Sequence, residues 1–336
     1  MTPQTPPHPR VLITVPGFGR ASAAPLERLA AAGCVVIPNP KGIRLTEDEV
    51  LGLVGDVEAI IAGTEPLTAR VLAAAPRLKI IARRGVGFDA VDVEAATASG
   101  IVVSTTVGVL SDAVADHTFG LLLAVARQIP LLDRTVKAGS WDRSPATDVH
   151  GKTLGIIGLG AIGRAVARRG AGFGMRLLAY DVAPDHNAAA ALGVTLRDLP
   201  AVLAESDFLT LHVPLSAATR HVINDATLRT MKPTAFLINT SRGDVVDEAA
   251  LLRALQQDRL AGAGLDVFHD EPVRDRALVA LDRVVATPHV ASHTRETLAL
   301  VEQSCADAVL ALLRGDRPLH VVNPEAYKKR RAGPHA

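Results

Sequence analysis

The chain has 336 residues and a formal net charge of +1, from 36 Lys and Arg against 35 Asp and Glu. This balance gives no electrostatic reason to expect nucleic acid or an anionic membrane as a partner. Cys34 and Cys305 are its two cysteines, and their wide separation excludes a disulfide framework and indicates no metal site. The length favours about two domains.

Neither a targeting segment nor a membrane segment is predicted. The start, MTPQTPPHPR, is rich in proline and lacks the apolar run of a signal peptide. The longest apolar stretch, around FGLLLAVA, is too short to span a bilayer. We therefore expect a cytoplasmic protein in a reducing compartment, without a membrane or nucleic-acid partner.

Short apolar strands alternate with helical segments through the first hundred residues. Helices are expected at 24–33, which ends on Gly33, and at 46–55, which has acidic residues in its first turn. This alternation is typical of a parallel sheet that is covered by helices on both faces. The strands are predicted at 10–15, 34–38, 58–63, 78–83 and 100–105.

The pattern changes at 111–130, which is predicted as one long helix with Leu121, Leu122, Val125 and Ile129 on one face. A second strand series follows, and then a last helix from Thr294 to about Leu313. Because that helix comes after the second series, we expect it to return to the first domain. The second series is predicted at 153–160, 176–181, 208–214, 235–241, 262–268 and 284–290.

The segment GLGAIGR, 158–164, contains the spacing G-x-G-x-x-G between an apolar strand and a helix. Gly158 permits a tight turn, Gly160 lets a pyrophosphate approach the backbone, and Gly163 lets the helix pack close to the sheet. The pyrophosphate would bind at the helix N-terminus, where free N–H groups and the helix dipole favour anions. The alternative is a glycine-rich turn without a ligand.

Asp181 favours the dinucleotide interpretation of this loop. It ends the next strand, 18 residues after Gly163, where a ribose-binding carboxylate is expected. The residues that follow it are Val-Ala-Pro, with no arginine to accept a 2′-phosphate. The predicted cofactor is therefore NAD rather than NADP.

Three further polar residues are predicted at the carboxyl ends of strands, where α/β folds place their chemistry. Arg242 follows one strand and has the planar fork that binds a carboxylate through two hydrogen bonds. Glu271 follows the next strand, and His289 follows the last, directly after Thr-Pro. Each residue alone has an ordinary structural interpretation: a surface arginine, a loop carboxylate, a histidine bonded to its own backbone. Their combination behind a dinucleotide loop indicates an enzyme.

With these motifs the chain resembles a known family, the D-isomer-specific 2-hydroxyacid dehydrogenases. The resemblance covers nearly the whole sequence and depends on GKTLGIIGLGAIGRAVA, SDFLTLHVPLSAATRHVIN, MKPTAFLINTSRGDVVDEAALLRAL, GAGLDVFHDEP and TPHVASHT. Within the family, RRGVGFDAVDVEAA (83–96) looks most like the 3-phosphoglycerate dehydrogenase-like branch, without the C-terminal regulatory domain of some members.

The resemblance implies an α/β fold of two doubly wound parallel-sheet (Rossmann-like) domains, with the active site in the cleft between them. The substrate-binding, flavodoxin-like domain is expected to comprise 1–107 and 288–336, and the NAD-binding domain 108–287. A homodimer is expected as well.

The resemblance also implies roles for individual residues. Arg242 would hold the carboxylate and keto oxygen of the substrate, and His289 would exchange a proton with that oxygen. Glu271 would orient His289 and stabilise its protonated form. The backbone of Val86 and Gly87, with the side chain of Arg84, would contact the substrate from the other domain. Cofactor contacts are expected at Ala161, Ile162, Val213, Pro214, Thr219, Thr240, Ser241, Asp266 and Ser292, besides the loop glycines and Asp181.

His293 and the pair Arg83 and Arg84 are each open to two interpretations. His293 is either an exposed helix-start residue or a contact to the distal end of the substrate. Of Arg83 and Arg84, one is expected to point into the cleft and bind a phosphate or polyhydroxyl tail, unless both form surface ion pairs. His212 is assigned to packing in the cofactor groove, and His117 to packing between domains.

The predicted function is thus an NAD-dependent D-2-hydroxyacid dehydrogenase or 2-keto acid reductase, most like 3-phosphoglycerate dehydrogenase. The first alternative is a hydroxypyruvate or glyoxylate reductase. Less favoured are a phosphite- or phosphonate-type dehydrogenase on the same scaffold and a non-catalytic NAD-sensing protein. A sensor has no need to keep Arg242, Glu271 and His289 together, so these residues favour the enzyme.

Overall fold

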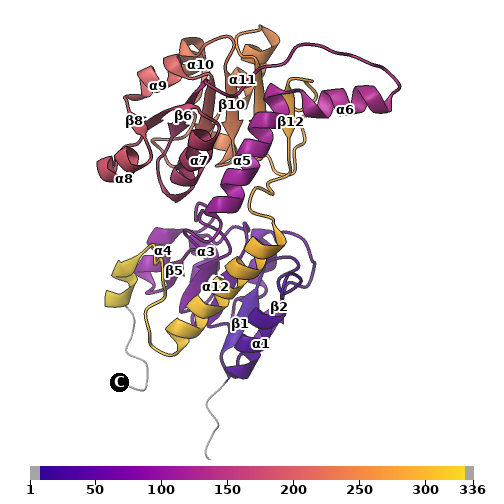
Figure 1. Ribbon diagram of the computed structural model, residues 1–336. Helices are drawn as coiled ribbons and strands as arrows, with labels where there is room; N and C mark the ends of the chain where they lie inside the picture. Colours follow the sequence, from indigo (N-terminus) through magenta and orange to yellow (C-terminus); the bar gives the residue numbers. More distant parts are fainter. Residues whose placement is uncertain (1–7, 330–336) are drawn as a thin grey trace, which may run out of the picture. The chain divides into compact units, whose positions relative to one another are not determined.

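The computed structural model describes residues 8–329, which form two compact α/β units (Figure 1). The first unit contains the described residues up to Leu110 and those from Thr294 onward, and the second is Ser111–His293. The expected limits, 107/108 and 287/288, lie a few residues from these divisions. The second unit is therefore inserted in the sequence of the first.

A parallel sheet with the strand order β2-β1-β3-β4-β5 forms the centre of the first unit. Its inner strands are continuous apolar runs because helices cover both faces of the sheet. The last helix of the chain, α12, packs on α1 and on the inner strand β4. The elements are β1 (Arg10–Ile13), α1 (Ala24–Ala31), β2 (Val35–Pro38), α2 (Glu47–Leu51), β3 (Ala59–Ala62), α3 (Ala69–Ala73), β4 (Ile80–Arg83), α4 (Val93–Ala98), β5 (Val102–Ser104), α12 (Arg295–Leu313) and the 3-10 helix η2 (Pro324–Lys328).

The second unit has a larger parallel sheet, in the order β12-β11-β10-β9-β6-β7-β8. The chain runs outward from β6 to β8 and then continues from β9 in the other direction, so the strand order reverses between β6 and β9. Doubly wound sheets bind ligands at the carboxyl ends of the strands at such a reversal. The elements are α5 (Ser111–Ala126), α6 (Ile129–Lys137), β6 (Thr153–Ile157), α7 (Ala161–Gly172), β7 (Arg176–Tyr180), α8 (His186–Ala191), β8 (Val194–Leu196), α9 (Leu199–Glu205), β9 (Phe208–Leu211), α10 (Asp225–Thr230), β10 (Phe236–Asn239), η1 (Gly243–Val245), α11 (Glu248–Gln256), β11 (Gly262–Leu265) and β12 (Val284–Ala286).

The prediction of one helix over 111–130 is wrong, because the structure has two helices there, α5 and α6. Gln128 between them is left-handed, with φ at 53°. Pro130 follows in the first turn of α6, where its missing N–H and its restriction of the preceding residue end the earlier helix. Ile129, expected on the apolar face with Leu121, is instead 52% exposed.

One strand was not predicted, and two features are absent from the described residues. The strand β8 was missed, since it has three residues and no alternating pattern of its own. Between residues 8 and 329, no helix has the length and apolar character needed to cross a membrane. In the same range, no group of three or more His, Cys, Asp or Glu side chains has an arrangement that could hold a metal ion.

Candidate active site

The three predicted catalytic residues follow three neighbouring strands. Arg242 follows β10, Glu271 follows β11 and His289 follows β12, and these strands are adjacent in the sheet. Because the strands are parallel, their carboxyl ends lie at the same edge. This edge is also the one at which the glycine loop follows β6. The second unit alone therefore brings the glycine loop and the three polar residues to one side of its sheet.

His289 and Glu271 form a direct pair. Nδ1 of His289 is hydrogen-bonded to Oε2 of Glu271 at 2.8 Å, and the backbone N–H of Phe268 donates to the other carboxylate oxygen at 3.1 Å. Burial raises the pKa of Glu271, but the hydrogen bond and charge of His289, the Phe268 N–H and the charge of Arg242 together bring it below its usual value. Glu271 is therefore ionised at neutral pH and faces the imidazole as an anion.

This pair leads to a prediction on the rate of keto-acid reduction. In Glu271→Gln the side chain keeps its size, but the anion that faces the imidazole is lost. We expect kcat to fall, because the amide orients the imidazole less well and does not balance its charge when it carries a proton. Steady-state rates at a saturating keto-acid concentration measure this loss. A kcat equal to that of the wild type would contradict it.

The loop that carries His289 is tied to the buried carboxylate of Asp266. Asp266 accepts hydrogen bonds from Thr287 Oγ1 at 2.6 Å and from the backbone N–H groups of Val290 and Ala291 at 2.9 and 2.8 Å. His117 Nε2 lies 2.9 Å from Thr287 Oγ1 and 3.5 Å from Asp266 Oδ1. Burial raises the pKa of Asp266, but these hydrogen bonds bring it below its usual value. His117, expected at a domain interface, thus supports the histidine loop inside the second unit.

Within this loop the strained backbone is at His289, whose φ is 54°. Its N–H donates to the carbonyl oxygens of Asp266 at 2.7 Å and of Thr287 at 3.1 Å, and the second bond closes a tight turn around Pro288. A non-glycine residue in the left-handed region is uncommon and costs about 1–2 kcal/mol. The loop therefore accepts an unfavourable backbone conformation at the residue that carries the imidazole.

Arg242 lies in an extended conformation between β10 and η1. Its carbonyl oxygen accepts from Asn239 Nδ2 at 2.8 Å, and its Nη1 donates to the carbonyl oxygen of Ser241 at 2.7 Å. Asn239 also accepts from the N–H and the hydroxyl of Ser241 at 3.0 and 2.8 Å. The side chain of Asn239 thus fixes the backbone on both sides of Arg242. This role of Asn239 was not predicted, although its place at the end of a strand was a signal for it.

The glycine loop fits a dinucleotide. Gly158 has φ at 94°, and a Cβ there would lie 2.7 Å from the carbonyl oxygen of His212, which follows β9. A Cβ at Gly163 would lie 2.1 Å from the carbonyl oxygen of Gly158, whereas one at Gly160 would meet no atom within 4 Å. Gly160 is the N-cap of α7 and makes no side-chain cap. The open backbone at this helix N-terminus has the form that receives a pyrophosphate.

Asp181 lies beside this loop. Its Oδ2 accepts from the N–H of Leu159 at 2.7 Å, and its Oδ1 accepts from the N–H of Ala183 at 2.9 Å. These hydrogen bonds hold the carboxylate at the end of β7, next to the turn between β6 and α7. The next residue, Val182, is apolar and 83% exposed. Asp181 is therefore not followed directly by a cation that could bind a 2′-phosphate.

We therefore predict a clear preference for NADH over NADPH. Two unit charges 4 Å apart repel by about 1 kcal/mol in water and about 4 kcal/mol at an intermediate dielectric. The 2′-phosphate of NADPH beside Asp181 should lower kcat/KM by roughly tenfold or more. Asp181→Asn keeps a side-chain oxygen that can accept from the N–H of Leu159 but removes the negative charge. It should therefore reduce the preference for NADH over NADPH. Asp198→Asn, which replaces one good helix N-cap by another in α9, is the matched control. Equal turnover of both cofactors by the wild type would contradict the assignment.

The other predicted cofactor residues lie in four segments of the second unit. Thr219 Oγ1 donates to the carbonyl oxygen of Pro214 at 2.6 Å, which orders the loop after β9. Thr240 is buried, and its hydroxyl lies 3.0 Å from that of Thr118. Burial lowers the pKa of His212 to about 3, so its ring is neutral beside Thr210. Ala161 and Ile162 begin α7, Val213 follows β9, Ser241 precedes Arg242, and Ser292 follows the His289 loop.

The predicted substrate residues of the first unit lie after β4. The carbonyl oxygen of Gly87 accepts from Arg83 Nε at 3.1 Å, and that of Gly85 accepts from the N–H of Thr106 at 3.1 Å. Arg83 is 4% exposed. Nε of Arg84 lies 3.5 Å from Oε1 of Glu302, a carboxylate of α12 that is 2% exposed. Val86 is half-buried in the same loop.

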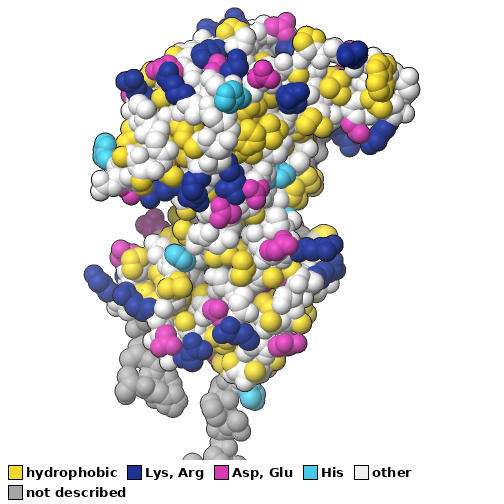
Figure 2. All heavy atoms as spheres, viewed as in Figure 1, with side chains coloured by type: hydrophobic (Ala, Val, Ile, Leu, Met, Phe, Trp, Pro, Cys, Tyr) yellow, Lys and Arg dark blue, Asp and Glu magenta, His cyan; other side chains and the backbone are white. Residues whose placement is uncertain are grey.

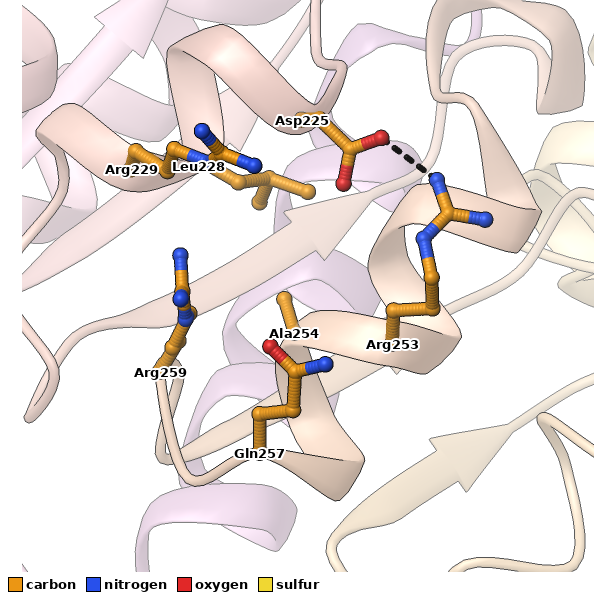
Figure 3. Close-up of a pocket in the computed structure, with 7 residues that line it drawn as sticks. All are labelled: Asp225, Leu228, Arg229, Arg253, Ala254, Gln257 and Arg259. Carbon is orange, nitrogen blue, oxygen red and sulfur yellow. Dashed lines mark hydrogen bonds and ion pairs between the residues drawn. The ribbon is translucent and has the colours of Figure 1, made fainter.

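A pocket at the opposite edge of the larger sheet is lined by three arginines (Figure 3). Its lining segment 257–259 leads into the amino end of β11, whereas the catalytic residues follow carboxyl ends. Arg229 lies in the last turn of α10 and Arg253 in the last turn of α11, where the helix dipole favours cations. Arg253 also forms an ion pair with Asp225. Helix termini thus account for two of the three arginines.

Comparison with known proteins defines the class of enzyme. The family model "D-isomer specific 2-hydroxyacid dehydrogenase, NAD binding domain" matches residues 119–291. The chain belongs to this family, so the predicted resemblance to the family and the predicted fold of two parallel-sheet α/β domains are confirmed. It is an oxidoreductase that acts on CH–OH groups and uses NAD as its cofactor.

Several relatives in this family are named for the substrates that they reduce. A glyoxylate reductase of Korarchaeum cryptofilum is 45% identical over 292 residues, which cover 84% of this chain and 88% of that protein. The crystal structure of a glyoxylate reductase from Paecilomyes thermophila superimposes with a TM-score of 0.85 at 31% identity, covering 95% and 99% of the two chains. An NADPH-dependent glyoxylate/hydroxypyruvate reductase from Sinorhizobium meliloti gives 0.83 at 35% identity, covering 97% and 100%.

Proposed function

We propose that the protein is a glyoxylate and hydroxypyruvate reductase that uses NADH. The observation that carries this proposal is the alignment of Arg242, Glu271 and His289 at three adjacent strand ends, on the sheet edge that also bears the glycine loop. The similarity to glyoxylate reductases supports this substrate class over the 3-phosphoglycerate dehydrogenase-like branch that the sequence analysis favoured.

Each side chain has one task in this reaction. NADH, when bound, supplies a hydride to the keto carbon. Protonated His289 donates its proton to the keto oxygen, and Glu271 aims the imidazole and stabilises its charged form. Arg242 holds the substrate carboxylate through two parallel hydrogen bonds and so orients the adjacent ketone. In the reverse direction neutral His289 accepts the proton of the alcohol.

Arg83, the last residue of β4, and Arg84 after it favour a small substrate. A phosphorylated tail needs an accessible guanidinium whose charge is not already balanced. Arg84 faces the buried carboxylate of Glu302, and Arg83 is buried and directed at the loop carbonyl of Gly87. Glyoxylate and hydroxypyruvate have no anionic tail and need no such cation. This is the physical reason to prefer them to 3-phosphohydroxypyruvate.

A substrate panel tests the proposal. Oxidation of NADH is followed with glyoxylate, hydroxypyruvate, 3-phosphohydroxypyruvate and a bulky apolar 2-keto acid. We expect the highest kcat/KM with one of the first two. A higher value with 3-phosphohydroxypyruvate that Arg84→Ala abolishes would return the protein to the branch favoured by the sequence analysis. Absence of turnover with every keto acid, while NADH binds, would support a non-catalytic sensor.

We also predict that the protein is a homodimer, formed through α6 and the segment that follows it. No residue of α6 is buried, and Ile129, Val136 and Trp141 are 52, 53 and 79% exposed. Apolar side chains gather on this part of the second unit (Figure 2). Light scattering at micromolar concentration should give twice the chain mass, and Val136→Glu should lower it. A monomer mass for the wild type would contradict the prediction.

A further inference from the structure

Two catalytic loops of the second unit run against each other, backbone to backbone. Gly243 follows Arg242, and Phe268 lies three residues before Glu271. A Cβ atom at Gly243 would lie 2.0 Å from the carbonyl carbon of Phe268 and 2.4 Å from the backbone nitrogen of His269. A glycine is therefore needed for this approach. The position of Arg242 relative to Glu271 is set where these loops meet.

His269 joins the two loops through its side chain and its backbone. Its Nδ1 is hydrogen-bonded to Oδ1 of Asp244, and its N–H donates to Oε1 of Glu248 at 2.6 Å. Asp244 lies two residues after Arg242, and His269 lies two residues before Glu271. This pair therefore links the two catalytic loops by a side-chain hydrogen bond next to their backbone contact.

Charge strengthens the connection. The hydrogen bond and charge of Asp244, with the charges of Asp270 and Glu248, raise the pKa of His269 above its usual value despite some desolvation. Burial raises the pKa of Asp244, but His269 and Arg220 bring it below its usual value. Arg220 Nη1 lies 2.6 Å from the second oxygen of Asp244. The pairing thus favours an imidazolium facing a carboxylate, which is a charge-assisted hydrogen bond. The His269 side chain is 63% exposed, so solvent screens part of this charge and the strengthening is modest.

We propose that the His269–Asp244 pair fixes the guanidinium of Arg242 relative to the Glu271–His289 pair, so that both are positioning residues for 2-keto acid reduction. The inference rests on the proposed function, because it assigns substrate binding to Arg242 and proton transfer to His289. His269 and Asp244 act through the two loops, and neither is a proton donor in the reaction. Loss of the pair leaves the fold intact and lets the Arg242 loop shift.

The test compares His269→Ala and Asp244→Ala with wild type, using glyoxylate as the substrate. A displacement of about 1 Å in a positioning group can lower activity by about a hundredfold. We expect KM for the keto acid to rise by roughly tenfold or more, with a smaller change in kcat and unchanged NADH affinity. His269→Asn should restore much of the loss, because its amide nitrogen can donate to Asp244. Arg276→Ala, an exposed change in the loop after Glu271, is the matched control.

Three results would overturn the inference. The first is a keto-acid KM in both alanine variants equal to that of the wild type. The second is a fall in kcat with constant KM, together with a lower melting temperature, which would indicate a purely structural role. The third is a double variant whose effect is the sum of the two single effects, since a working pair should show coupling. If the wild type does not reduce glyoxylate, the comparison is made with the 2-keto acid it reduces best. A wrong substrate in the proposed function would therefore not be mistaken for a failure of the positioning pair.

Discussion

Replacement of His289 should lower kcat for keto-acid reduction by about 10²–10⁴-fold, while NADH still binds. This is the usual contribution of a positioned general acid, and His289 has the partner that such an acid requires, Glu271 at 2.8 Å. Alanine is a poor sole variant, because the left-handed backbone at this residue, φ 54°, strains most side chains. His289→Asn tolerates that conformation and removes the acid, so the two variants together separate chemistry from strain.

The measurement is single-turnover reduction, with NADH affinity from fluorescence titration and melting temperature as a check on folding. His186→Ala, an exposed histidine at the start of α8, is the control and should behave as the wild type. A near-native kcat in His289→Asn would remove the imidazole from the mechanism. A loss in His289→Ala that His289→Asn recovers would show that backbone strain, not proton transfer, was the cause.

Arg242→Lys should lower kcat/KM for the keto acid by at least about tenfold, although the charge is kept. Lysine is a point charge on a flexible stem and cannot form the two parallel hydrogen bonds that orient a carboxylate. The effect should lie mainly in KM, because the ground-state carboxylate is what the fork binds. Cofactor affinity should change little, since Arg242 follows β10 while the glycine loop follows β6.

Steady-state kinetics with glyoxylate over a wide concentration range measure this effect. Arg276→Lys, an exposed arginine in the loop after Glu271, is the control. If Arg242→Lys has the kinetics of the wild type, the substrate carboxylate is bound elsewhere. Loss of NADH binding in the same variant would instead place Arg242 in the cofactor site.

Much of the fold could be predicted because its signals are local. Continuous apolar strands, the glycine loop and the run ending in Thr-Pro before His289 each indicate a structure within a short window of sequence. The helix boundary at Gln128 was not predicted. Apolar residues continue at helical spacing as far as Ile129, and this pattern was given more weight than the tendency of Pro130 to end a helix. The strand β8 was missed for the opposite reason, since three residues carry too little pattern.

The residues of the candidate site also differ in whether a local sequence signal predicts them. Arg242, Glu271 and His289 are predicted from strand ends and family motifs, both of which are properties of the sequence. The roles of Asn239, His117 and His269 were not, because each depends on a contact with a residue distant in sequence or on a turn geometry. His117 and Thr287 are separated by 170 positions, and only the folded sheet brings them together.

The insertion of one unit into the other has a consequence for the order in which the chain is made. A ribosome releases β1 to β5 first, then the whole of Ser111–His293, and only afterwards α12. The apolar face of the first sheet that contacts α12, including Ile80 and Val102, stays uncovered until then. The inserted unit, by contrast, is continuous and can complete its own core during synthesis. Nascent chains stalled before Thr294 should therefore hold a folded dinucleotide-binding unit joined to an incomplete first sheet, the species most exposed to chaperones and to aggregation.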